Sequence, residues 1–184
     1  MASHNQHIDR QRYCTVPRTL CFVTRGDDVL LIKGAPHKPV WPNRYNGVGG
    51  HVEADEDVFS AAQREIREET GLDVVDLRLR GIANIPVVPG ESGVLLLVFT
   101  AEAVERRLRP SSEGELVWIN RCHLTELDLV EDLIVLLPAI LDAPANAMPF
   151  FAHYHTDELG QLHIRFAECD NGQPQPPIRH GGML

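Results

Sequence analysis

Residues 50–72 read GHVEADEDVFSAAQREIREETGL, and the interpretation of the whole chain starts from this stretch. Within it we predict a helix over residues 57–70, because four apolar residues recur at spacings of three and four positions. These are Val58, Ala61, Ala62 and Ile66. Gly71 follows at once, and a glycine just after the last periodic residue is typical of a helix end.

The predicted helix also carries a cluster of acidic residues. Glu65, Glu68 and Glu69 lie within one turn of each other and therefore share one sector of its surface. Like charges at this spacing cost roughly 0.2–0.5 kcal/mol per pair, and Arg64 can offset only part of that. A hard divalent cation such as Mg²⁺ would neutralise the carboxylates and still leave coordination positions for phosphate oxygens. The alternative is an ordinary solvated helix face.

The spacing around the helix bears on this choice. From Gly50 the sequence runs through five residues to Glu56, then through seven more to RE at positions 64–65 and on to Leu72. It resembles the Nudix box, G-x5-E-x7-R-E-U-x-E-E-x-G-U, where U is a bulky aliphatic residue. All nine specified positions are filled. Coincidence is negligible at about one chance in fifteen for each fixed residue.

The resemblance implies an α/β Nudix fold, an α-β-α sandwich around a mixed β-sheet, and an enzyme that cleaves a diphosphate bond with Mg²⁺, or Mn²⁺ as a substitute. It implies that the metal is held by the Gly49 carbonyl and by box glutamates. Arg64 would orient these carboxylates, and Glu56 would support the site from the preceding loop. A distant glutamate is expected to serve as base or metal ligand, with Glu113 as first choice and Glu115 as second. The implied metal ligands are Gly49, Glu65, Glu68, Glu69 and Glu113.

Outside the box the chain resembles the MutT-like subgroup that includes oxidised purine nucleoside triphosphatases. The segment YNGVGGHVE at residues 45–53 carries this likeness, as does an acidic pair before a proline-containing helix. The chain departs from the subgroup where Tyr45 replaces a tryptophan and His51 replaces a lysine, and Val130 stands near the position of another tryptophan. A broad (d)NTP pyrophosphohydrolase, an enzyme for ADP-ribose, dinucleotides or capped RNA, and a non-catalytic nucleotide-binding module remain as alternatives. The implied substrate contacts are Asn46, His51, Glu131 and Asp132.

We expect one domain over residues 17–167, between a polar tail at 1–16 and a Pro- and Gly-rich tail at 168–184. Apolar runs separated by turn residues predict the strands, and Pro138 is expected to break or kink a second helix. The predicted strands are 19–24, 29–32, 74–83, 94–100, 116–119, 150–155 and 161–166, and the second helix is 131–141.

Composition excludes several classes of protein. A net charge of −9 argues against nucleic-acid binding, since a binding face would have to be basic. The apolar runs are too short to cross a bilayer, and the four scattered cysteines form no CxxC pair, which favours a reducing compartment. We therefore expect a cytoplasmic monomer or homodimer whose partner is a small-molecule nucleotide.

Overall fold

The computed structural model describes residues 12–87 and 91–167. Most of the predicted N-terminal tail and all of the predicted C-terminal tail therefore lie outside the described residues. The domain itself begins slightly earlier than expected, because the first strand starts at Thr15.

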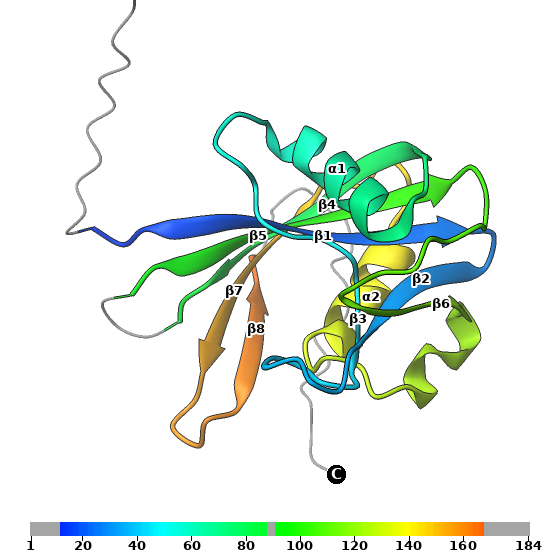
Figure 1. Ribbon diagram of the computed structural model, residues 1–184. Coiled ribbons are helices and arrows are strands. Elements are labelled where there is room, and N and C mark those ends of the chain that lie inside the picture. The colour runs from blue at the N-terminus through cyan, green and yellow to red at the C-terminus, as the bar shows by residue number, and fades with distance from the viewer. Residues whose placement is uncertain (1–11, 88–90, 168–184) are drawn as a thin grey trace, which may run out of the picture.

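A mixed β-sheet forms the centre of the protein (Figure 1). Its main path runs in the order β3-β2-β1-β5-β4-β7-β8, and β6 pairs with the free side of β2. The pairs β1–β5 and β4–β7 are parallel, and the remaining pairs are antiparallel. The strands are β1 (Thr15–Arg25), β2 (Asp28–Gly34), β3 (Tyr45–Asn46), β4 (Val74–Ile85), β5 (Gly93–Ala103), β6 (Gly114–Asn120), β7 (Phe150–Thr156) and β8 (Leu162–Phe166).

Helices cover both faces of this sheet (Figure 1). Alternate side chains of β1 and β2 point to opposite faces, so an unbroken apolar run supplies two cores. Cys21, Val23 and Leu30 pack with α1 (Val58–Thr70) on one face. Phe22 and Leu31 pack with α2 (Leu133–Leu141) on the other. The predicted α-β-α sandwich around a mixed sheet is confirmed.

Three local features differ from the predictions. Residues 45–46 were not among the predicted strands, yet they form β3 against Ile32 and Lys33. A 3-10 helix, η1 (Arg121–Glu126), follows β6 and was not predicted. Pro138 does not end α2, which continues to Leu141, although the proline cannot donate the intrahelical hydrogen bond to the Ile134 carbonyl.

The loop before α1 is tied to the middle of the sheet. The amide of Cys21 donates to the Val48 carbonyl at 2.7 Å, and Val48 returns a bond to Cys21 at 3.1 Å. The amide of Thr19 donates to the Gly50 carbonyl at 2.8 Å. Residues 48–50 therefore act as a short extra partner of β1.

Among the described residues no helix has the length and apolar character needed to span a membrane.

Candidate active site

Helix α1 is held at both ends by the residues that its sequence pattern predicts. Asp57 is the N-cap, and its Oδ1 accepts from the amides of Phe59 at 2.8 Å and Ser60 at 3.0 Å. Gly71 ends the helix with φ of 75°, a left-handed conformation that glycine adopts without strain. Its amide donates to the Arg67 carbonyl. These caps fix which residues of the helix face the loop that precedes it.

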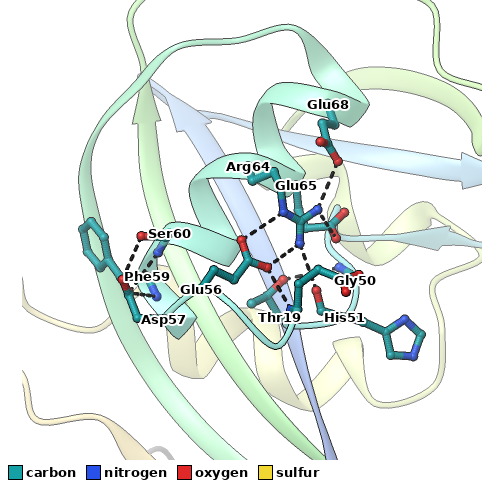
Figure 2. Close-up of polar contacts among 11 residues, drawn as sticks. Thr19, Gly50, His51, Glu56, Asp57, Phe59, Ser60, Arg64, Glu65 and Glu68 are labelled. Atoms are coloured by element: carbon teal, nitrogen blue, oxygen red, sulfur yellow. Dashed lines mark hydrogen bonds and ion pairs between the residues drawn. The ribbon is translucent and has the colours of Figure 1, made fainter. Parts of the chain in front are cut away.

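Arg64 lies at the centre of the polar network between the loop and the helix (Figure 2). Its Nε and Nη2 donate to the two carboxylate oxygens of Glu56, at 3.0 and 2.7 Å. Its Nη1 donates to Glu65 at 2.9 Å and to Glu68 at 3.0 Å. A further Nη2 bond reaches the His51 carbonyl at 3.0 Å. A guanidinium has five N–H groups, so every donor of Arg64 is used within the protein.

The carboxylates of Glu65 and Glu69 lie against the glycine pair that precedes the loop. The amide of Gly49 donates to Glu69 Oε2 at 3.1 Å. The side chain of Glu65 fills the space that a Cβ at Gly50 would need, so only glycine leaves room for it there. Two adjacent glycines thus let two carboxylates approach one stretch of backbone.

Glu69 carries the clearest electrostatic signature of the site. Burial raises the pKa of Glu69 to about 7, although the hydrogen bond from Gly49 works in the opposite direction. The negative charges of Glu65 and Glu113 raise the pKa further, while the positive charge of Lys38 lowers it. The long-range effect of Glu113 means that a residue distant in sequence lies within electrostatic reach of the helix carboxylates.

The oxygen donors of this site fit a hard divalent cation. Glu65, Glu69 and the backbone of Gly49 offer carboxylate and carbonyl oxygens, which are the ligands that Mg²⁺ and Mn²⁺ prefer. Within the described residues, no three acidic, histidine or cysteine side chains already converge as a finished metal cluster. Glu65 is turned toward Arg64 instead, and Glu68, with 61% of its side chain exposed, lies at the edge of the network.

Glu113 is the first choice for the distant carboxylate of the site. It ends the loop before β6, and its carboxylate forms an ion pair with Lys38 from the loop after β2. Pairing of Gly34 with Gly114 brings these two loops together. Glu115, the second choice, is an exposed residue of β6 opposite Lys33. It lines a cavity of about 440 Å³ together with Gly34, Pro36 and Ser112.

Three of the four predicted substrate contacts lie near β3 and form a second group of site residues: Asn46 belongs to this strand, and Glu131 and Asp132 follow the segment beside it. The amide of Tyr45 donates to the backbone carbonyl of Asp128 at 2.9 Å, which places β3 beside the segment that leads into α2. Asn46 Oδ1 accepts from the amide of Gly47 at 2.8 Å, as in an ordinary turn. Glu131 is paired with Arg44 at 2.6 Å. The His51 side chain is exposed and points away from Arg64 (Figure 2).

Asp132 differs from these residues because its carboxylate is buried. Oδ2 accepts from the Tyr154 hydroxyl at 2.9 Å, whereas Oδ1 is buried and has no hydrogen-bond partner within the described residues. Burial raises the pKa of the Asp132 carboxyl and that of the Tyr154 hydroxyl. A buried acceptor without a donor is costly.

Sequence reasoning missed three residues that take part in these contacts. Lys38 pairs with Glu113, Arg44 holds Glu131, and the Tyr154 hydroxyl binds Asp132. No local pattern identifies them, because each acts on a partner far away in the chain. The one available signal was the scarcity of lysine, which appears only at positions 33 and 38.

The candidate site thus consists of a capped helix whose carboxylates face a glycine loop, on one face of the mixed sheet of an α/β domain. The NUDIX domain profile matches residues 15–140, which is more than half of the chain. The protein belongs to the Nudix family, and the resemblance seen in the box is confirmed.

Several known proteins are similar to this chain. The oxidized purine nucleoside triphosphate hydrolase of Mus musculus is 29% identical over 123 residues, covering 67% of this chain and 78% of that protein. The NAD-capped RNA hydrolase NudC of Pseudomonas aeruginosa is 36% identical over 97 residues, covering 53% of this chain and 32% of the relative. The chain therefore spans about a third of the length of that relative.

A solved structure supports the same fold. The MutT protein from Bacillus halodurans superposes with a TM-score of 0.66 at 24% identity, covering 86% of this chain and 99% of that one. At this level of identity the likeness concerns the fold.

Proposed function

We propose that the protein is a Mg²⁺-dependent hydrolase that cleaves a diphosphate bond of a nucleoside triphosphate, yielding a monophosphate and pyrophosphate. Oxidised purine (d)NTPs are included in this substrate class, and Mn²⁺ is the expected substitute cation. The observation that carries the proposal is the approach of the Glu65 and Glu69 carboxylates to the Gly49–Gly50 backbone, with Arg64 hydrogen-bonded to Glu65 beside them.

The residues of the chain have separate roles in this proposal. Glu65, Glu69 and the Gly49 carbonyl would hold the cation, and Glu68 could turn in from the edge. A bound divalent cation polarises phosphoryl oxygens and makes an attacking water more acidic. Arg64 and Glu56 keep the carboxylates oriented. Glu113 would accept a proton or complete the ligand set, and its electrostatic effect on the pKa of Glu69 supports this role.

Base recognition would take place in the second group of residues. The unpartnered Asp132 Oδ1 suits a purine N–H, and the Asn46 amide can offer both a donor and an acceptor. Val130 is buried in the core at 3% exposure, so it offers no stacking surface where the subgroup has an aromatic residue. Selectivity for oxidised purines would then rest on hydrogen bonds, and a broad (d)NTP range is equally compatible with this arrangement.

The test is a turnover screen of wild type and Glu69→Gln, with and without a chelator. Substrates are canonical and oxidised (d)NTPs, ADP-ribose and dinucleoside polyphosphates, and released pyrophosphate is measured separately from other products. We expect chelator-sensitive pyrophosphate release by wild type and at least a 100-fold loss in Glu69→Gln, since a missing ligand removes most of the cation's charge stabilisation.

The matched control for that variant is Glu102→Gln, an exposed glutamate of β5, which should retain wild-type activity. Circular dichroism of both variants checks that the fold is intact. Full turnover by a folded Glu69→Gln protein would reject the assigned metal site.

A second candidate keeps the site and changes the substrate to ADP-ribose or another nucleoside diphosphate derivative. It is favoured by the similarity to the NAD-capped RNA hydrolase of Pseudomonas aeruginosa. The same screen separates the two, because cleavage of such substrates releases two monophosphates and no pyrophosphate.

A further inference from the structure

The lysines of the chain lie in one short segment. Lys33 and Lys38 are its only lysines, and the other basic residues among its 17 Lys and Arg are arginines. Both lie at the end of β2 and in the loop that follows it, beside the loop that carries Glu113. Lysine presents a compact charge with three rotatable donors, whereas arginine presents a fixed planar fork. The two lysines therefore differ chemically from every other cation of the protein.

Lys38 is held beside Glu113, the distant carboxylate of the proposed site. Its ammonium forms an ion pair with Glu113, and its charge lowers the pKa of Glu69. The amide of Ala35 donates to the Glu113 carbonyl at 3.4 Å, so backbone contacts also join the two loops. Lys33 has a different neighbour, since its ammonium lies over the Tyr45 ring, 5.5 Å from the ring centre.

The arginines nearest to the two groups of site residues have no comparable freedom. All five N–H groups of Arg64 are used on Glu56, Glu65, Glu68 and the His51 carbonyl. Arg44 is paired with Glu131 and Asp128. Lys38 has three N–H donors and spends one on Glu113, so it retains donors for a ligand.

We propose that Lys38 is a phosphate ligand of the site and binds the pyrophosphate portion of a nucleoside triphosphate. Glu113 is the residue that positions the Lys38 ammonium. The proposal rests on the proposed function and adds to it, because it favours substrates with phosphates beyond the scissile bond. A negatively charged site needs a cation on the side where those phosphates lie, and the ammonium supplies it directly from the chain.

The first test uses the scarcity of lysine and requires no turnover. The full-length protein is acetylated with an amine-reactive ester, and modification of Lys33 and Lys38 is quantified by mass spectrometry. Reactions contain Mg²⁺ alone or Mg²⁺ with pyrophosphate. We expect pyrophosphate to slow modification of Lys38 by about 10-fold, the scale of one charge-assisted hydrogen bond, and to leave Lys33 within about 2-fold.

The second test separates a phosphate ligand from a structural residue. Calorimetry measures Mg²⁺-pyrophosphate and nucleoside monophosphate binding to wild type, Lys38→Met, Lys38→Arg and the matched control Lys33→Met. Lys38→Met should bind pyrophosphate about 10-fold more weakly and the monophosphate unchanged, because only one part of the substrate meets the ammonium. Lys38→Arg should recover part of the affinity, and Lys33→Met should equal wild type.

The outcomes distinguish this proposal from the one on which it rests. If wild type hydrolyses nucleoside triphosphates while pyrophosphate neither protects Lys38 nor binds Lys38→Met more weakly, the role of Lys38 is overturned and the hydrolase stands. If the monophosphate weakens as much as pyrophosphate, Lys38 has a general structural role and the proposal is again overturned. If wild type cleaves no diphosphate substrate, both proposals fall.

Discussion

Arg64 shows at the scale of one residue how the site is kept in order. A single guanidinium joins Glu56 in the loop to Glu65 and Glu68 in the helix and also holds a backbone carbonyl. The sequence motif identifies Arg64 and its acidic neighbours. It cannot show that every donor is used, because that depends on where the loop places the His51 carbonyl.

Arg64→Lys should separate charge from geometry. The charge remains, but the two-pronged contact with Glu56 and the bonds to the helix carboxylates cannot all be made by an ammonium. We expect kcat/KM to fall about 10- to 100-fold and cation affinity to weaken, as for other residues that orient metal ligands. Steady-state kinetics and a Mn²⁺ titration measure both effects. Arg67→Lys, on the exposed side of the same helix with 72% of its side chain exposed, should behave as wild type.

Asp132 leads to a prediction about pH. Its pKa is raised in the folded protein by burial, whereas the ordinary value of 3.8 applies to the unfolded chain. The folded state therefore holds the proton more tightly, and the carboxyl lowers stability as pH rises through this interval. Asp132→Asn removes that dependence, so the free energy of unfolding of the variant minus that of wild type should be larger at pH 7 than at pH 4.

Urea denaturation of Asp132→Asn and wild type at the two pH values measures this difference. A pH-independent effect of Asp132→Asn would contradict the assigned burial of its charge.

At the scale of elements, two neighbouring glycines should respond differently to the same substitution. A Cβ at Gly49 would overlap the Thr19 carbonyl of β1, and its φ of 147° disfavours side chains. A Cβ at Gly50 would instead meet the Glu65 side chain, which can move. Gly49→Ala should therefore cost several kcal/mol, about 2–4, whereas Gly50→Ala should cost about 1 kcal/mol or less.

Gly50→Ala should also affect activity, separately from its small effect on stability. Gly50→Ala displaces a proposed metal ligand, so the folded variant should lose most of its turnover. Thermal unfolding and kinetics at a temperature where both variants are folded test this. Equal stability of the two variants would show that the loop can move away from β1.

The elements that sequence analysis located well are those with local signals. The helix predicted over residues 57–70 matches α1 with Asp57 as its cap, because apolar period, cap and terminal glycine agree. The strand predicted over residues 19–24 begins earlier, at Thr15. Residues 15–18 extend because they pair with Gly93–Leu96 of β5, a contact between segments far apart in the chain. Such pairing leaves no mark on the local sequence.

At the scale of the whole molecule, a bound cation should stabilise the fold. A ligand that binds only the folded state adds RT ln(1 + [L]/Kd), about 2.7 kcal/mol at a hundredfold excess over Kd. Mg²⁺ or Mn²⁺ should therefore raise the unfolding temperature of wild type and shift Glu69→Gln far less. Differential scanning calorimetry with a chelator as reference measures the shift, and equal shifts in both proteins would place the cation elsewhere.

The parts of the site that sequence could not assemble are those that come from different regions of the chain. Glu113 was chosen as a distant carboxylate, but its position near Glu69 depends on the pairing of β2 with β6. The approach of β3 to residues 128–130 likewise brings Asn46 toward the start of α2. Topology decides these neighbours, and the box alone does not specify it.

Residues 48–50 share backbone bonds with Thr19 and Cys21 of a strand that lies deep in both cores. Displacement of this segment would break backbone hydrogen bonds to a strand at the centre of the sheet. Amide hydrogens of Val48 and Cys21 should thus exchange with deuterium as slowly as those of global unfolding. Ligand entry and release would therefore leave the backbone of residues 48–50 in place and involve movement of side chains there.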